Sequence, residues 1–237
     1  KDNYNVKFYT KLPVKLNKNI SLKNMEKIVF RSLKTLNKNS IECISFHRID
    51  HLLKNKNKWL DFLNNLKNNK IIKKVGVSIQ NEKEFLNFLD IPSLDYIQLP
   101  YNLIDPRWDY LLDKHKSKLK NKTLHMRSIF LQGLLLTGEK KFWRRTNYKK
   151  YNRVLNWLEE LSTNYNCNRI DLCLRYIMAK ENLFDGFIFG INSFNEIEEI
   201  KNRMLFLEPF TKKDIIKIQY LRPKISSKLY NPIYWNK

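Results

Sequence analysis

The stretch FYTKLP, residues 8–13, opens as an apolar, strand-like run and ends with a lysine two residues before a proline. A lysine at the exit of a buried strand is unfavourable unless its ammonium group has a partner or a role. The stretch therefore raises the question of what Lys11 faces. The answer begins with the pattern that follows it, because further short apolar runs of this kind recur along the chain.

Six such runs alternate with longer stretches of helical periodicity. Strand–helix alternation is typical of βαβ units and a parallel sheet. We therefore predict one α/β domain over residues 1–237, built from six strand–helix units. The predicted strands are 6–10, 41–46, 71–78, 95–100, 123–128 and 186–190, and the helical spacings lie at 25–33, 59–66, 108–112, 154–161 and 170–178.

Composition narrows the class of protein. No run approaches the ~18 apolar residues of a membrane span, and the most apolar stretch, SIFLQGLLL, is interrupted by Gln132 and Gly133. The three cysteines and four histidines show no metal-ligand spacing, so we expect no metal site, free thiols and a reducing, cytoplasmic setting. The net charge of +22 permits nucleic-acid binding, but lysines are spread over the whole chain, which favours a compositional bias.

Polar side chains stand at or near the ends of all six predicted strands. In a parallel sheet or barrel, functional groups gather beyond the carboxyl ends of the strands. Each residue alone has a structural explanation, such as a helix cap or a half-solvated rim position. Together they indicate one site. The residues are Lys11, His47, Ser78, Gln98, Arg127 with Ser128, and the turn formed by Gly190, Ile191, Asn192 and Ser193.

Six stretches resemble, in their order along the chain, the motifs of aldo-keto reductases: FYTKLP, ISFHRID, VGVSIQ, DYIQLPYNLID, MRSIFLQGLLLTG and GFIFGINSFNEIEEI. The C-terminal NPIYWNK also looks like the tail of that family. The resemblance runs from residue 6 to the end. It implies a (β/α)₈ TIM-type barrel that transfers hydride from NADPH or NADH to an aldehyde or ketone.

The resemblance also implies roles for the strand-end residues. Lys11 would lower the pKa of a catalytic tyrosine, which is what an ammonium group beside a phenol does, and His47 would orient the substrate carbonyl. Ser78 and Gln98 would bond the nicotinamide carboxamide. Arg127, with Ser128 beside it in the cofactor site, would stack its planar guanidinium on the nicotinamide ring.

The last motif is expected to hold the rest of the cofactor. By resemblance, the turn from Gly190 to Ser193 would bind the phosphates at a helix N-terminus. Ser193 and Glu196 have capping-box spacing, so Glu196 either only caps the helix or, as the resemblance implies, also lies near the adenosine 2′-position. A carboxylate there would repel a 2′-phosphate, so NADH is favoured over NADPH. Ile79 and Ile200 stand where many relatives have asparagines. The basic loop LLLTGEKKFWRRTNYKK is expected either to fold over the pyrophosphate or to be a solvated loop with aromatic anchors.

The family pattern begins two units earlier, with strand ends that supply an aspartate and a tyrosine. Only ten residues precede Lys11, and Tyr9 on the same strand would lie one layer deeper. The resemblance therefore implies that residues 1–237 carry strands three to eight of the barrel and lack the first two units. We expect this chain alone to lack the proton donor and, with open strand edges, to self-associate.

The favoured function is NAD(P)-dependent reduction of a small aldehyde or ketone, including sugar-derived carbonyl compounds, by the complete enzyme. One alternative is a catalytically inactive relative that binds a nucleotide or a partner. Another is a basic α/β protein that binds nucleic acid, for which salt-sensitive binding without nicotinamide affinity would be diagnostic. We expect no membrane partner.

Overall fold

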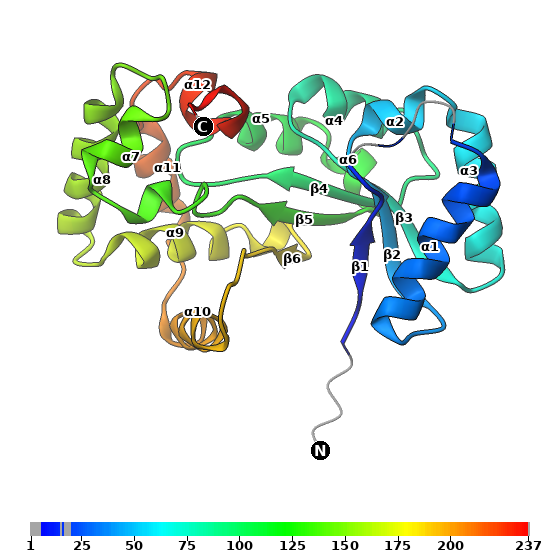
Figure 1. The fold of residues 1–237 in the computed structure, drawn as a ribbon. Coiled ribbons are helices and arrows are strands. Elements are labelled where there is room, and N and C mark those ends of the chain that lie inside the picture. The colour runs from blue at the N-terminus through cyan, green and yellow to red at the C-terminus, as the bar shows by residue number, and fades with distance from the viewer. Residues whose placement is uncertain (1–5, 15, 17–19, 237) are drawn as a thin grey trace. The chain divides into compact units, whose positions relative to one another are not determined.

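The computed structural model describes residues 6–14, 16 and 20–236. It contains one six-stranded sheet in the order β1-β2-β3-β4-β5-β6, and the strand pairs β1–β2, β2–β3 and β3–β4 are parallel (Figure 1). Contacts between residues divide the chain into two compact units. Unit 1 comprises 1–99 and 115–125, and unit 2 comprises 100–114 and 126–237.

Unit 1 holds most of the sheet together with the helices that connect its strands. The elements that begin in it are β1 (Tyr9–Lys11), α1 (Leu22–Leu36), β2 (Ile41–Phe46), α2 (Ile49–Leu53), α3 (Lys56–Asn68), β3 (Ile72–Ser78), α4 (Glu82–Leu89), β4 (Tyr96–Pro100), α6 (Lys116–Leu119) and β5 (Thr123–Arg127). The first strand ends on Lys11 and not before it, so the predicted strand 6–10 is shifted towards the C-terminus. The shift follows from the pairing of Tyr9, Thr10 and Lys11 with β2.

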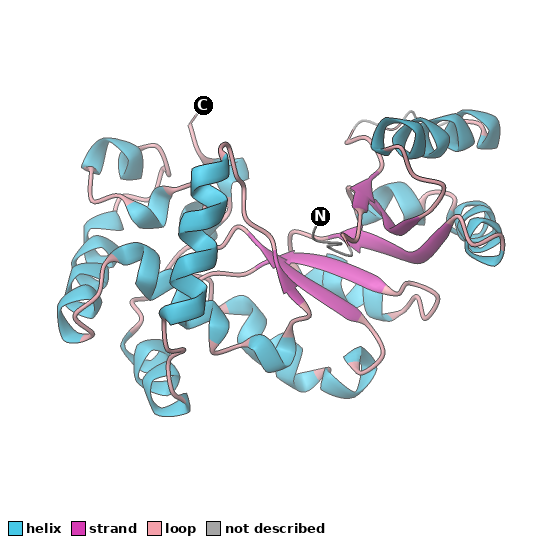
Figure 2. Cartoon of the chain, turned by 90° about the horizontal axis from the view of Figure 1, so that it is seen from below, coloured by secondary structure: helices cyan, strands magenta, loops and turns pink. Residues whose placement is uncertain are grey.

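Unit 2 is mainly helical. Figure 2 colours the helices of the whole chain cyan and its strands magenta. Its elements are α5 (Arg107–Lys114), η1 (Leu134–Leu136), α7 (Lys140–Arg144), α8 (Tyr151–Asn164), α9 (Arg169–Met178), η2 (Glu181–Leu183), β6 (Gly186–Phe187), α10 (Phe194–Phe206), α11 (Lys212–Leu221), α12 (Ser227–Tyr230) and η3 (Pro232–Tyr234). Strand β6 is shorter than the predicted 186–190. After Ile188, whose N–H donates to the Met126 carbonyl at 2.8 Å, the chain leaves the sheet.

The helices form where the apolar spacing predicts them. Helix α1 illustrates the causes: Ser21 caps its N-terminus by accepting the Asn24 N–H, and Met25, Val29 and Leu33 bury one face at i, i+4 and i+8. The helix ends at Asn37, whose φ of 51° is the left-handed conformation common after a last helical turn.

The register of unit 1 gives the sheet one polar face. Lys11 pairs with Ser45, Ser45 with Gly76, and Gly76 with Tyr96, while Ser78 pairs with Gln98. Residues opposite one another in neighbouring strands point to the same side, so these side chains share a face. Gly76 is required there, because a Cβ atom would lie 2.5 Å from the Tyr96 carbonyl oxygen.

Unit 2 is anchored by buried aromatic and charged groups. Tyr101 donates to the Asp109 carboxylate at 2.5 Å, and Lys180 donates to the same oxygen at 3.2 Å. Arg222 donates to the Tyr176 hydroxyl at 2.6 Å. Burial raises the pKa of both tyrosines, so both remain neutral hydrogen-bonding groups. The network fixes α5, α9 and the end of α11 to one another.

Candidate functional site

In unit 1, three of the predicted residues meet at the carboxyl ends of β1, β3 and β4. The Lys11 ammonium donates to Gln98 Oε1 at 2.5 Å. Gln98 is 3% exposed, and Ser78, which is 2% exposed, lies opposite it in the β3–β4 register. The lysine at the exit of the first strand therefore has a partner, and that partner is a second predicted site residue.

A layer of aromatic residues lies one pleat below this edge. Gln98 Nε2 donates to the Tyr96 hydroxyl at 3.2 Å, and that hydroxyl lies 3.2 Å from His125 Nδ1. The Tyr9 ring packs against both, with centroids 5.2 Å from Tyr96 and 4.8 Å from His125. Tyr9 occupies the deeper layer that the sequence predicts.

The sequence reasoning missed Tyr96 and His125. The available signal was their spacing, since each lies two residues before a predicted site residue on its own strand, Gln98 and Arg127 respectively. Alternate residues of a strand share a face, so both positions belong to the polar face of the sheet.

The hydrogen bonds fix the orientation of the Gln98 amide. Lys11 can only donate, so the amide oxygen must face it, and Nε2 then faces Tyr96. One lone pair on Oε1 and one N–H on Nε2 remain for another group. A carboxamide has both a donor and an acceptor and can use this pair, so the geometry is compatible with the role predicted for Gln98.

His47 lies in the turn between β2, which ends at Phe46, and α2, which begins at Ile49. Its side chain is half-buried. The position is the strand end that the sequence predicts, and the role in orienting a carbonyl remains a prediction.

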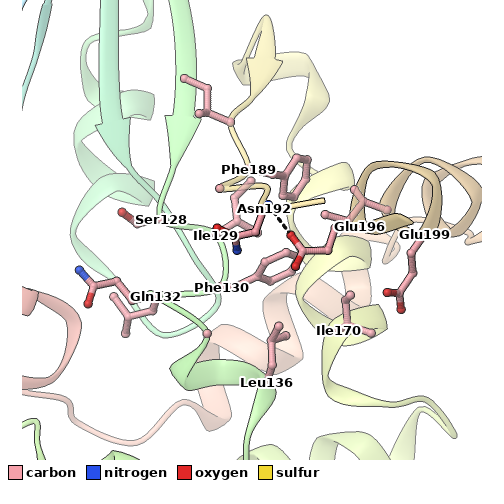
Figure 3. A pocket seen from close by; sticks show the side chains of 15 residues that line it. Ser128, Ile129, Phe130, Gln132, Leu136, Ile170, Phe189, Asn192, Glu196 and Glu199 are labelled. Atoms are coloured by element: carbon pink, nitrogen blue, oxygen red, sulfur yellow. Dashed lines mark hydrogen bonds between the residues drawn. The ribbon is translucent and has the colours of Figure 1, made fainter. Parts of the chain in front are cut away.

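In unit 2, four of the predicted residues line one cavity of 620 Å³, and Arg127, Ile191 and Ser193 are not among its lining residues (Figure 3). Ser128, Gly190, Asn192 and Glu196 line it. Arg127, at the end of β5, donates to the Ser128 hydroxyl at 3.1 Å. The cavity therefore brings together the end of the fifth strand and the turn after the sixth, as the sequence predicts for the cofactor-binding segments.

Ser193 caps α10, because its hydroxyl accepts the Glu196 N–H at 3.3 Å. Glu196, however, does not complete a standard capping box with the N–H of Ser193. Its carboxylate accepts the N–H of Asn192 at 2.8 Å, one residue earlier, which Figure 3 shows as a dashed line. Two amides near this helix terminus are thus satisfied by side chains of the chain itself. A bound phosphate would have to use other donors or displace Glu196.

The charges around the cavity are acidic. Glu196 and Glu199 line it, and Glu199 is held by Arg203, whose Nη2 lies 2.9 Å from the carboxylate. Among the described residues, the lining includes no lysine or arginine. A carboxylate disfavours a neighbouring phosphate monoester and can accept a hydrogen bond from a hydroxyl.

Most of the other lining residues are apolar. The rings of Phe130 and Phe189 pack against each other with centroids 5.5 Å apart, and the aliphatic lining residues are Ile129, Leu131, Leu136, Ile170, Ile188 and Ile200. A cavity of this size with apolar walls and a few polar groups is typical of small-molecule and cofactor sites. That it holds part of a cofactor, and that it selects a 2′-hydroxyl, remain predictions.

The basic loop that follows β5 is anchored by Trp143. Its indole is fully buried and donates to the Thr137 carbonyl at 2.8 Å. The aromatic anchors expected for this loop are present. None of its lysines or arginines is among the described residues that line the 620 Å³ cavity, and closure over a pyrophosphate remains a prediction.

Two other findings concern the described part of the chain. It contains no cluster of three or more histidine, cysteine, aspartate or glutamate side chains arranged to hold a metal ion. Its helices are too short or too polar for any of them to cross a bilayer.

Comparison with known proteins gives a consistent family. A search of curated proteins finds no match. Among solved structures, the chain is similar to the aldo-keto reductase AKR11C1 from Bacillus halodurans, with a TM-score of 0.76 for the holo form and 0.69 for the apo form. The holo form is 18% identical, and the alignment covers 95% of this chain and 75% of that one.

A third structure, the aldo-keto reductase MGS-M4 from a Medee basin deep-sea metagenome library, gives a TM-score of 0.62 at 16% identity, covering 95% of this chain and 75% of that chain. These likenesses confirm the predicted fold class, an α/β protein of the TIM-barrel type with six parallel strands. The model of the Aldo/keto reductase family matches residues 1–222. This match covers most of the sequence and confirms the predicted relationship: the chain belongs to the aldo/keto reductase family.

Proposed function

We propose that the complete protein is an NAD(P)-dependent oxidoreductase that reduces a small aldehyde or ketone, with NADH preferred over NADPH. The observation that carries the proposal is the hydrogen bond from Lys11 to Gln98, with Ser78 opposite Gln98. It joins the group proposed to tune a proton donor to the two groups proposed to hold a carboxamide. Family membership supports the reaction class.

In this mechanism the nicotinamide, when bound, supplies a hydride to the carbonyl carbon. Lys11 would place a positive charge beside the phenol that protonates the carbonyl oxygen, a group not assigned to any tyrosine of the described residues, and would lower the pKa of that phenol. His47 would donate a hydrogen bond that orients the carbonyl. Ser78 and the remaining donor and acceptor of Gln98 would hold the carboxamide in one orientation.

The residues of unit 2 bind the rest of the cofactor. Arg127 would stack on the flat nicotinamide ring, and its neighbour Ser128 lies on the wall of the 620 Å³ cavity. The turn Gly190–Ser193, including Ile191, would approach the phosphates through its backbone. Glu196 would accept the adenosine 2′-hydroxyl and repel a 2′-phosphate, which is the basis of the proposed preference for NADH.

Cofactor binding to the purified chain tests the proposal directly. Titration followed by NADH fluorescence should give a lower Kd for NADH than for NADPH. Glu196→Arg should reverse the order, with a change of about fivefold for each cofactor, the value for an ion pair of ~1 kcal/mol at an exposed site. Glu196→Gln keeps the acceptor oxygen and should only reduce the difference.

Two outcomes would contradict different parts of the proposal. Tighter binding of NADPH by the unmodified chain would remove Glu196 as the selecting residue. Failure to bind either cofactor would remove the proposed function itself.

A further inference from the structure

Unit 2 contains a second cavity, of 320 Å³, which shares part of its lining with the first. Two aromatic rings, Phe142 and Trp235, line it, together with Arg145 and Glu139. Gln132 and Gly133 line both cavities. The rest of the lining comes from Leu134, from the loop 137–148 and, far away in sequence, from Trp235 in the C-terminal segment 224–236.

Hydrogen bonds fasten these two parts together. The Asn236 N–H donates to the Arg145 carbonyl at 2.8 Å, and the Asn147 amide donates to the Tyr234 carbonyl at 2.9 Å. The Tyr148 hydroxyl donates to the Lys224 carbonyl at 3.0 Å. These bonds hold the loop and the C-terminal segment in one arrangement, so the cavity is pre-formed.

The Trp235 ring is also fixed in place. Its indole N–H donates to the carbonyls of Lys228 and Leu229, at 3.1 and 3.0 Å. An immobilised aromatic wall loses little conformational freedom when a ligand packs on it, which favours binding of a flat apolar body.

The segment between the cavities has an unusual backbone. Leu131, Gln132 and Gly133 have consecutive positive φ angles of 48°, 54° and 80°. Non-glycine residues in this conformation are strained, and such strain is concentrated at ligand sites. The strained segment supplies a wall to each cavity, so it links the second cavity to the proposed cofactor site.

The charges of the two cavities differ. Glu139 is paired with Lys141 at 2.6 Å. Within the part of the chain that the structure describes, the Arg145 guanidinium has no acidic partner within ion-pair distance. Among the described lining residues, the second cavity thus has one paired carboxylate and one guanidinium without an acidic partner, whereas the first cavity is lined by Glu196 and Glu199.

We propose that the 320 Å³ cavity binds a small aromatic carboxylate, with its ring between Phe142 and Trp235 and its carboxylate on Arg145. A guanidinium binds a carboxylate through two parallel N–H donors, and aromatic walls favour a flat ring. The further step, that this ligand is the carbonyl substrate, rests on the proposed function. The preference of the cavity for an aromatic carboxylate over a neutral analogue is independent of the proposed function.

The test compares 2-naphthoate with its neutral analogue 2-naphthalenemethanol, titrated calorimetrically into the full chain without cofactor. Naphthoate should bind about fivefold more tightly, as expected for one solvent-accessible ion pair. Arg145→Gln should abolish this preference while leaving the Kd of the alcohol unchanged, and Arg145→Lys should keep part of it.

Arg144→Gln is the matched control, because Arg144 is the exposed neighbour outside the lining and its replacement removes the same net charge. Equal affinity for the acid and the alcohol in the unmodified chain, no binding of naphthoate, or an equal loss in Arg144→Gln and Arg145→Gln would each overturn the inference.

Circular dichroism of both variants establishes that they are folded. NADH titration of the same preparations separates the two proposals. If naphthoate binds through Arg145 and NADH does not bind, the proposed function fails and this inference stands.

Discussion

Substituting Gly76 by alanine probes the packing that positions the polar face of unit 1. A Cβ atom at this position would lie 2.5 Å from Tyr96 Cδ1, 2.5 Å from the Tyr96 carbonyl oxygen and 2.8 Å from Tyr96 Cβ. The ring can rotate, but the carbonyl belongs to the backbone of β4, which is paired with β3 at this residue. The two strands must therefore separate locally.

The magnitude follows from two opposing effects. Forcing an extra methyl group into a packed interior typically costs ~1–3 kcal/mol, and a backbone contact puts Gly76 near the upper value. Alanine restricts the unfolded chain more than glycine does, which returns about 0.5–1 kcal/mol. We expect a net loss of ~2 kcal/mol in the free energy of unfolding. A displaced Tyr96 also weakens its hydrogen bonds to Gln98 and His125.

The assay is urea unfolding followed by far-ultraviolet circular dichroism, in which a lower midpoint at unchanged slope reports a change in stability. Gly138→Ala is the matched control, because the nearest atoms to its added Cβ, on Arg169 and Glu159, are 3.8 Å away. Its stability should stay within about 0.5 kcal/mol. The reasoning is refuted if Gly76→Ala loses less than about 1 kcal/mol or no more than Gly138→Ala.

Three further predictions concern Gln98, the activity of the chain with and without two added βα units, and the buried thiol of Cys173. Gln98→Leu removes the acceptor of the Lys11 ammonium and the amide oxygen and nitrogen proposed to bind the carboxamide. It should raise the Kd for NADH by about tenfold, which corresponds to the loss of one or two hydrogen bonds. An unchanged Kd would contradict the proposed role of Gln98. The 237-residue chain should show only background carbonyl reduction. Fusion to two βα units bearing the aspartate and tyrosine of the family should give NADH-dependent turnover. In that fusion, Lys11→Met should slow turnover by ~10²–10⁴-fold and leave the affinity for NADH unchanged. Turnover by the unfused chain would refute the expected need for these two units. Burial raises the pKa of the Cys173 thiol to about 12, whereas the unfolded thiol ionises near ~8.5. Its contribution to stability is therefore complete below that pH and declines as the pH rises towards 12, so Cys173→Ala should flatten the alkaline fall in urea midpoint.

Hydrophobic periodicity was sufficient for the elements that bury one face. The spacing of Met25, Val29 and Leu33 predicts α1. The serine before FNE predicts a helix that starts near Ser193, and Ser193 is the N-cap of α10. Strand ends were equally informative, because a parallel sheet brings them to one edge whatever the details of packing. The meeting of Lys11 with Gln98, 87 residues apart, is the clearest case.

What the sequence did not predict depends on contacts whose alternatives are close in energy. Glu196 can cap the N–H of Ser193 or of Asn192, and only the conformation of the turn selects Asn192. The hydrogen bond between Tyr96 and His125 depends on the strand register, which a local pattern does not specify. The hydrogen bond between the Asn147 amide and the Tyr234 carbonyl joins residues 87 apart, and no local sequence signal marks such a pair.

The two cavities of unit 2 suggest how a chain with a net charge of +22 selects among anions. The overall charge attracts every negatively charged ligand, and salt screens that attraction over about 8–10 Å. Selection must then come from local groups. By our proposals, Glu196 would act at the first cavity against a 2′-phosphate, and Arg145 would act at the second cavity in favour of a carboxylate. Added salt should therefore weaken NADH and naphthoate binding together, because it acts on the field that both share. Added salt should have a smaller effect on the two affinity ratios, NADH over NADPH and naphthoate over its alcohol, because the two side chains set these ratios at contact distance.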